Sequence, residues 1–225
     1  MKTLAALLIA GLAGHAFADD VFTKSPIKDW TKKPGSTTEP RFQPPVAKRL
    51  KLANGMALLV VENKKLPIAS FVLVAPGAGT AADPAGKAGL AAFTADLLDE
   101  GAGGLTALGI AEEQDRLGAS IKIGAGTDAA VVAVDTLSRT LDTTIDLVTK
   151  VITQPAFEQK EFERVRGDRK TAIDLRRDQP REVVGIVLGG ALYGHDSAYG
   201  HAGAGTQASF KNLTLADTKG FFAEH

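Results

Sequence analysis

Residues 83–101, DPAGKAGLAAFTADLLDEG, contain the helix around which the fold of the chain is organised. Apolar side chains recur there every three or four residues, which is the spacing of one face of an α-helix. They are Leu90, Phe93, Leu97 and Leu98. The pattern predicts a helix over residues 86–100. It ends before Gly101, since glycine readily adopts the left-handed conformation that closes a helix.

Two β segments precede this helix. Residues 46–62 predict a hairpin, because Leu50 and Leu52 alternate with charged residues and Asn54-Gly55 favours a type I′ turn. Met56–Val61 is expected to form the return strand. Residues 66–75, LPIASFVLVA, are apolar nearly throughout. This composition predicts a third strand that is buried on both faces.

After this helix, predicted strands mostly follow one another, and so do predicted helices. Thr106 is expected to cap a helix that ends at Leu117, and residues 119–125 and 129–135 are expected to form two strands. Four further helices are predicted, at residues 137–152, 158–177, 180–193 and 215–222. Strands in hairpins and helices in runs predict an α+β fold, in which an antiparallel sheet is covered by helices on one side.

The N-terminus predicts export. Lys2 is followed by an apolar run at residues 4–14 and by the small-x-small pattern Ala16-Phe17-Ala18. Residues 1–18 therefore read as a cleaved signal peptide, and the run is too short to span a bilayer. We expect a periplasmic or secreted protein with no membrane span after cleavage.

The rest of the chain divides into two parts. Residues 19–45 contain five prolines and read as an extended leader arm. Residues 46–225 are expected to form one lobe. The chain carries 26 Lys and Arg against 26 Asp and Glu, so no basic surface suggests nucleic acid as a partner. It contains no cysteine, which excludes disulfides and thiol catalysis.

The region from residue 46 onward resembles the insulinase/pitrilysin/mitochondrial processing peptidase family of zinc metallopeptidases. The matching motifs are Asp83-Pro84, Gly86-Lys87, Gly89-Leu90-Ala91, Asp115-Arg116-Leu117-Gly118-Ala119, Gln154-Pro155-Ala156-Phe157, Asp178-Gln179-Pro180 and Tyr193-Gly194. The resemblance covers residues 46–225 and implies the lobe of a pitrilysin-type peptidase.

The family's zinc helix carries His-x-x-Glu-His, because residues four apart lie on one helical face and can reach one ion. In this chain the first histidine falls on Ala92, the glutamate on Ala95 and the second histidine on Asp96. The third ligand would fall near Ala172. Alanine has no lone pair to donate, and a single carboxylate does not make a tight zinc site. The resemblance therefore implies a non-catalytic homologue that has no catalytic residues and binds no cofactor.

The resemblance also implies partners. Non-catalytic members pair with an active metallopeptidase subunit of the same family, which supplies the zinc, and the pair encloses unfolded peptides. Two alternatives stay open. One is a zinc-dependent metalloendopeptidase with an atypical site. The other is a non-functional truncated remnant, since family lobes continue past residues 215–225 with a strand and a helix that close the sheet.

A few other side chains could serve a metal or an acid–base pair. His195 and His201 lie six residues apart in a glycine-rich loop and could bind a metal with Asp196, although exposed loop histidines explain them more simply. Carboxylates at residues 99–100 and 112–113 could act as substitute ligands, and Glu163 could be a displaced one. Solvated helix faces with charge pairs are the simpler interpretation.

Overall fold

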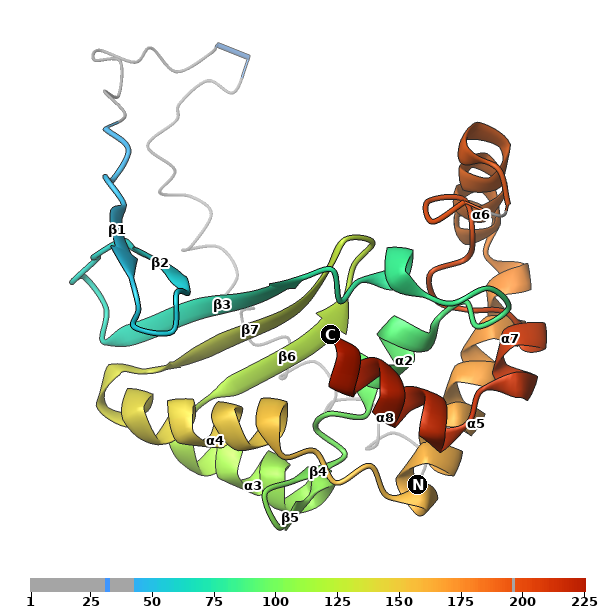
Figure 1. Ribbon diagram of the computed structural model, residues 1–225. Helices are drawn as coiled ribbons and strands as arrows, with labels where there is room; N and C mark the ends of the chain where they lie inside the picture. The colour runs from blue at the N-terminus through green and yellow to red at the C-terminus, as the bar shows by residue number, and fades with distance from the viewer. Residues whose placement is uncertain (1–30, 33–42, 196) are drawn as a thin grey trace, which may run out of the picture. The chain divides into compact units, whose positions relative to one another are not determined.

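The computed structural model of the chain describes residues 31–32, 43–195 and 197–225 (Figure 1). It contains two compact units, Met1–Glu62 and Asn63–His225. The predicted signal peptide lies outside the described residues, as does most of the predicted leader arm at residues 19–45.

The described part of the first unit is a β-hairpin. Strand β1 (Lys48–Lys51) pairs antiparallel with β2 (Ala57–Val60), which confirms the predicted hairpin. The turn differs from the predicted type I′, which needs positive φ at both central residues. Gly55 has φ 90°, but Asn54 does not have a positive φ. The backbone N–H of Leu52 donates to the carbonyl of Met56 and that of Gly55 donates to the carbonyl of Leu52, so residues 52–56 form the connection between the strands.

The second unit is built on a three-stranded antiparallel sheet. Its strands are β3 (Ile68–Pro76), β7 (Ala129–Leu137) and β6 (Ser120–Ala125), in the order β3-β7-β6. The register places Phe71 of β3 and Ile121 of β6 opposite Val134 of the central strand. Side chains alternate between faces along a strand, so these three residues share one face.

Helices cover that face of the sheet. They are α3 (Ala107–Leu117) and α4 (Leu141–Thr153), which lie on the same side in Figure 1. The shared core consists of Leu117, Ile121, Val132, Val134, Leu147 and Val148. The predicted cap is also present, because the Thr106 hydroxyl accepts from the N–H of Gly109. The predicted α+β fold, with helices on one side of an antiparallel sheet, is confirmed.

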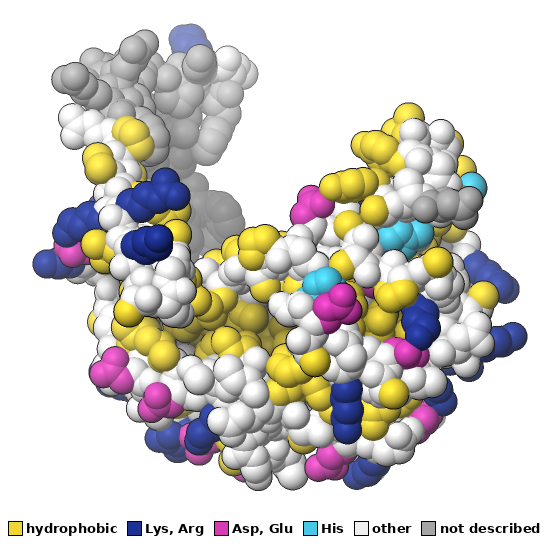
Figure 2. Space-filling model, viewed as in Figure 1, with side chains coloured by type: hydrophobic (Ala, Val, Ile, Leu, Met, Phe, Trp, Pro, Cys, Tyr) yellow, Lys and Arg dark blue, Asp and Glu magenta, His cyan; other side chains and the backbone are white. Residues whose placement is uncertain are grey.

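Strand β3 is less buried than the sequence predicted. It lies at the edge of the sheet, and its second face carries Ile68, Val72 and Val74, which are 54%, 61% and 58% exposed. Figure 2 shows apolar side chains gathered over the sheet. The prediction that this strand is buried on both faces is therefore wrong, because the apolar run does not reveal that only one face receives a helical layer.

The remaining helices form a second core beside the sheet. They are α2 (Leu90–Asp96), α5 (Gln159–Leu175), α7 (Gln207–Asn212) and α8 (Leu215–Glu224). The sequence did not predict α7. Short strands β4 (Gly101–Ala102) and β5 (Leu105–Thr106) pair with each other, and 3₁₀ turns occupy Thr80–Ala82 (η1), Ser138–Thr140 (η2) and Arg176–Asp178 (η3).

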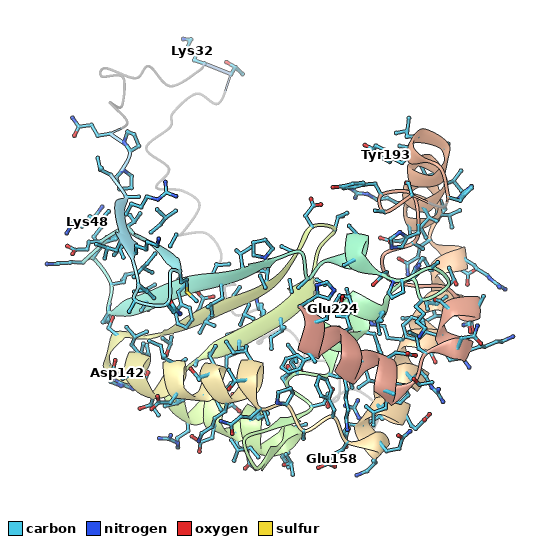
Figure 3. All side chains as sticks on the ribbon, viewed as in Figure 1. Lys32, Lys48, Asp142, Glu158, Tyr193 and Glu224 are labelled. Carbon is cyan, nitrogen blue, oxygen red and sulfur yellow. The ribbon has the colours of Figure 1, made fainter. Side chains whose placement is uncertain are left out.

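Helix α6 (Pro180–Tyr193) begins at the predicted proline and projects from the rest of the second unit (Figure 1). Its large apolar side chains are mostly exposed: Val183, Val184, Val187, Leu188, Leu192 and Tyr193. Tyr193 marks its last turn in Figure 3. None of the helices among the described residues is long and apolar enough to cross a membrane.

Candidate functional site

Helix α2, which carries the motif positions, is seven residues long, shorter than the predicted helix at 86–100. Gly86 and Gly89 have φ of 78° and 90°, so the chain turns before the helix begins. The Asp83 carboxylate accepts hydrogen bonds from the N–H groups of Gly89 (2.6 Å) and Ala91 (2.8 Å). A carboxylate placed there satisfies amides that have no partner within the helix and complements its dipole.

An aromatic core fixes the position of α2. Phe93 is 0% exposed and makes edge-to-face contacts with Phe162 of α5 and Phe210 of α7, each with ring centroids 5.3 Å apart. Rings in this arrangement are worth about 0.5–1.5 kcal/mol beyond their buried area. The scaffold that orients the motif positions is therefore densely packed, whatever side chains those positions carry.

The motif positions lie on α2 and α5. Ala92 is half-buried, Ala95 is buried, and Asp96 is the last residue of α2. Ala172 lies on α5 and is exposed. The structure joins these two helices near the motif through Arg169, one turn before Ala172, which reaches Asp96.

Arg169 and Asp96 form a close ion pair. The Arg169 Nε atom donates to Asp96 Oδ2 at 2.5 Å, and Nη2 contacts the same oxygen. Both side chains are mostly buried, at 28% and 27% exposure. Burial raises the pKa of Asp96, while the charge and hydrogen bonds of Arg169 oppose that rise. The single carboxylate at the motif positions is thus held by a guanidinium cation.

A second ion pair joins the same two segments. Arg164 of α5 contacts Glu100 and also bonds to Glu161 at 2.7 Å. These two carboxylates hold the pKa of Arg164 above its usual range. Burial raises the pKa of Asp99, with Glu100 and Asp96 adding to the effect. Glu100 is therefore matched by a cation of α5.

The other predicted carboxylates have local partners. Glu163 accepts from Gln159 Nε2 at 2.9 Å and contacts Arg166, both within α5, so its hydrogen bonds stay on its own helix. Glu113 pairs with Arg116 at 2.6 Å on α3. Among residues 31–32, 43–195 and 197–225, no group of three or more His, Cys, Asp or Glu side chains is placed to hold a metal ion.

The predicted loop histidines lie beside a cavity of about 350 Å³ between residues 81–88 and the chain after α6. His201 Nε2 lies 3.3 Å from Asp83 Oδ2, and its Nδ1 lies 3.2 Å from the carbonyl oxygen of Ser197. His195 also lines the cavity. Asp196, the third member of the predicted loop site, lies outside the described residues.

Sequence reasoning missed Arg169 as a partner of the motif helix. A signal was present, because Phe162, Val165 and Arg169 follow the three-to-four spacing of one helical face. Phe162 and Val165 are buried, so the same face brings Arg169 towards α2. The contact of Asp83 with His201 had no comparable signal, since 118 residues separate the two side chains.

Comparison with known proteins identifies the family of this lobe. The α+β scaffold is like that of a peptidase, but its motif helix carries few side chains that could bind a metal. Residues 58–198 match the family model described as Insulinase (Peptidase family M16). The chain belongs to the insulinase family.

Three relatives are informative. The chain is 25% identical over 163 residues to the "Non-peptidase homolog YmxG" of Helicobacter pylori, an alignment that covers 72% of this chain and 37% of that protein. It is 28% identical to the crystal structure of a peptidase M16 inactive domain from Pseudomonas fluorescens, with a TM-score of 0.74. A protease from H. pylori is 21% identical, with a TM-score of 0.71, and supports the fold alone.

These relatives are longer than the chain. The alignment with the Pseudomonas structure covers 79% of this chain but only 43% of that one. The alignment with the H. pylori protease covers 80% of this chain and 43% of the protease. The chain therefore spans about two fifths of the length of the proteins that it matches.

Proposed function

We propose that this chain is a non-catalytic member of the insulinase family that serves as a peptide-binding or structural subunit beside an active peptidase of the same family. The observation that carries the proposal is the state of the motif helix. Ala92 and Ala95 offer no ligand and no base, and Asp96 is committed to Arg169. The guanidinium places a fixed positive charge beside the one carboxylate that could have helped to bind a metal.

The names of two relatives support the proposal. One is named a non-peptidase homolog and another an inactive domain of the same peptidase family. Related proteins are thus already named as lacking peptidase activity.

Pairing is supported by helix α6. Leu192 and Val184 are 66% and 62% exposed, and no charged residue occurs between Glu182 and the end of the helix. A continuous apolar surface of this kind marks a site of protein association. We propose that the active subunit packs against α6.

Peptide binding is supported by the sheet. Strands β3 and β6 are its two edges, and the face opposite the helical layer is apolar around Val72 and Val74. An unfolded peptide can add to such an edge through backbone hydrogen bonds while its alternate side chains meet the sheet face. The predicted signal peptide would place this binding in the periplasm or outside the cell.

The catalytic part of the proposal is tested by zinc content and cleavage. The purified full chain, free of tags, is incubated with zinc, dialysed and analysed by mass spectrometry for bound metal, and then assayed on fluorescent casein. We expect no stoichiometric zinc and no cleavage that a chelator suppresses. Stoichiometric zinc together with chelator-sensitive cleavage would contradict the proposal and support the atypical metalloendopeptidase.

The subunit role is tested separately. The chain is co-expressed with an intact His-x-x-Glu-His peptidase from the same genome, and complex formation is followed by light scattering. Leu192→Glu on α6 should abolish the complex, whereas Leu108→Glu, at a residue of similar exposure (69%) on α3, should not. A complex that tolerates Leu192→Glu contradicts the role of α6. A chain that stays unfolded even with the peptidase supports a remnant.

A further inference from the structure

The loop at residues 197–205 lies between α6 and α7 and is held against the start of α2. The central contact is between His201 and Asp83, whose side chains are 17% and 1% exposed. His201 Nε2 faces Asp83 Oδ2 at 3.3 Å, and His201 Nδ1 faces the Ser197 carbonyl oxygen at 3.2 Å. Both ring nitrogens of one imidazole therefore face oxygen atoms.

Two simultaneous hydrogen bonds, one at each ring nitrogen, require an extra proton. A neutral imidazole carries one N–H and an imidazolium carries two, and a carbonyl oxygen can only accept. If Nδ1 donates to Ser197, Nε2 must either carry a second proton for Asp83 or accept one from a protonated Asp83. Burial raises the pKa of Asp83, and its bonds to Gly89, Ala91 and His201 oppose that rise. In either form the docked pair holds one proton more than a neutral histidine beside a carboxylate.

The contact also joins the two walls of a cavity. Asp83, Pro84 and Gly86 line one wall of the space of about 350 Å³, and Ser197 and His201 line the other. Separation of His201 from Asp83 would widen this space.

We propose that residues 197–205 form a pH-sensitive latch over this cavity, closed while the pair of His201 and Asp83 holds its shared proton and loosened when that proton is lost. The proposal is independent of the proposed subunit function. Because docking takes up a proton, the docked state is stabilised at low pH, and this stabilisation is lost as the pH rises. The latch therefore weakens with increasing pH.

Other charged groups around the latch have their own partners. Lys87 follows the residues of the opposite wall, does not line the cavity, and pairs with Asp217 of α8. Arg176 of η3 donates to the carbonyl of Gly205 at 3.3 Å. Imidazole is the side chain that ordinarily titrates between about pH 5 and 8, so these contacts are expected to persist across that range.

A further contact tethers the loop, and one more imidazole lines the cavity. Tyr199 donates to Asp128 Oδ1 at 2.7 Å, and this contact raises the pKa of Tyr199. It therefore persists and keeps the loop attached while the latch opens. His195 lines the same cavity, so a control variant must distinguish its contribution to the pH dependence from that of His201.

Hydrogen exchange measured by mass spectrometry tests the latch in the full chain. Exchange rates are corrected for the intrinsic effect of pH and compared at about pH 5.5 and about pH 8.5. In the wild type we expect protection of peptides from residues 197–205 to fall about tenfold at the higher pH, the size expected when one charge-assisted hydrogen bond is lost. Peptides from α4 should change little.

Two matched variants assign the effect. His201→Gln should keep the loop at its high-pH protection throughout, whereas His195→Gln, the same change on the same cavity, should retain the wild-type pH dependence. Equal protection of the wild-type loop at both pH values would overturn the proposal. So would a pH dependence that survives His201→Gln.

Nitrogen NMR of the His201 ring in the wild-type protein tests the latch directly, so the result does not depend on whether a variant folds. At about pH 5.5 the His201 ring should show either protons on both nitrogens, or one N–H at Nδ1 with Nε2 accepting from Asp83. A ring with its only proton on Nε2 at that pH would refute the latch.

Discussion

Helices α2 and α6 are both apolar, but they are used in opposite ways. Five of the seven residues of α2 are buried, whereas Gly190 is the single buried residue of the fourteen in α6. The helix that carries the motif positions is therefore the one that the fold packs most completely. The comparison shows that α2 serves this lobe as a core element, whereas α6 does not.

The difference has a local cause as well as a tertiary one. Helix α2 is capped by Asp83 and wedged between Phe162 and Phe210. Helix α6 contains Gly185 and Gly189, which weaken a helix by about 1 kcal/mol each relative to alanine. Short helices in water depend on packing for most of their stability. A helix of this composition with an exposed apolar surface is suited to packing against another chain.

The largest effect should follow from truncating the core of α2. Phe93→Ala removes a fully buried ring and leaves a cavity between two other rings, so the free energy of unfolding should fall by about 3–5 kcal/mol. Urea denaturation of the purified chain measures the change. Phe93→Leu should cost clearly less. A loss below about 1 kcal/mol for the alanine variant would show that α2 is not the packing centre described above.

Breaking the ion pair at the motif should have the next largest effect. Asp96→Ala leaves the Arg169 guanidinium without its partner in a mostly buried position, and should cost about 1–3 kcal/mol of unfolding free energy. The double variant Asp96→Ala with Arg169→Met should cost less than the two single changes added together, because no uncompensated charge remains. Strict additivity in urea denaturation would contradict the coupling.

A stabilising change should come from Thr94. Its hydroxyl oxygen on α2 is buried and has no hydrogen-bond partner among the described residues. Thr94→Val keeps the shape and removes the unsatisfied group, so the unfolding free energy should rise by about 1 kcal/mol. Thr149→Val, on an exposed part of α4, is the control and should change stability by less than about 0.5 kcal/mol. A loss of stability at Thr94 would reveal a partner for its hydroxyl.

The smallest effect should come from α6. Val184→Ser replaces a side chain that is 62% exposed, and should change the stability of the isolated chain by less than about 0.5 kcal/mol. Val148→Ser on α4, where the residue is 2% exposed, should cost about 2 kcal/mol or more. Thermal unfolding of the two variants gives the contrast. Equal losses would mean that α6 is covered within the chain itself.

Much of the fold could be predicted because the signals were local. The cap at Thr106, the stop at Gly118 and the proline that opens α6 each act within one turn of the residue concerned. The length of α2 could not be predicted in the same way. Its apolar spacing continues past its true ends, and the bonds from Asp83 decide where it begins.

The candidate site shows the same division. The loss of ligands at Ala92 and Ala95 was visible directly, since it depends only on side-chain identity. The role of Asp96 was not, because its partner Arg169 lies 73 residues away in the chain. Nor did the sequence show that β3 lies at an edge with Val72 exposed, because an apolar run is compatible with one covered face or two.

The sequence by itself determined the order of most strands and helices, the family resemblance and the absence of histidine and glutamate at the motif positions of the helix. These properties depend on residue type and spacing within a few turns. Only the tertiary structure decided that a guanidinium holds the remaining carboxylate, that His201 meets Asp83, and that α6 is exposed. Those outcomes depend on packing between distant segments, and the energy of an ion pair or an apolar contact depends on which segments fold together.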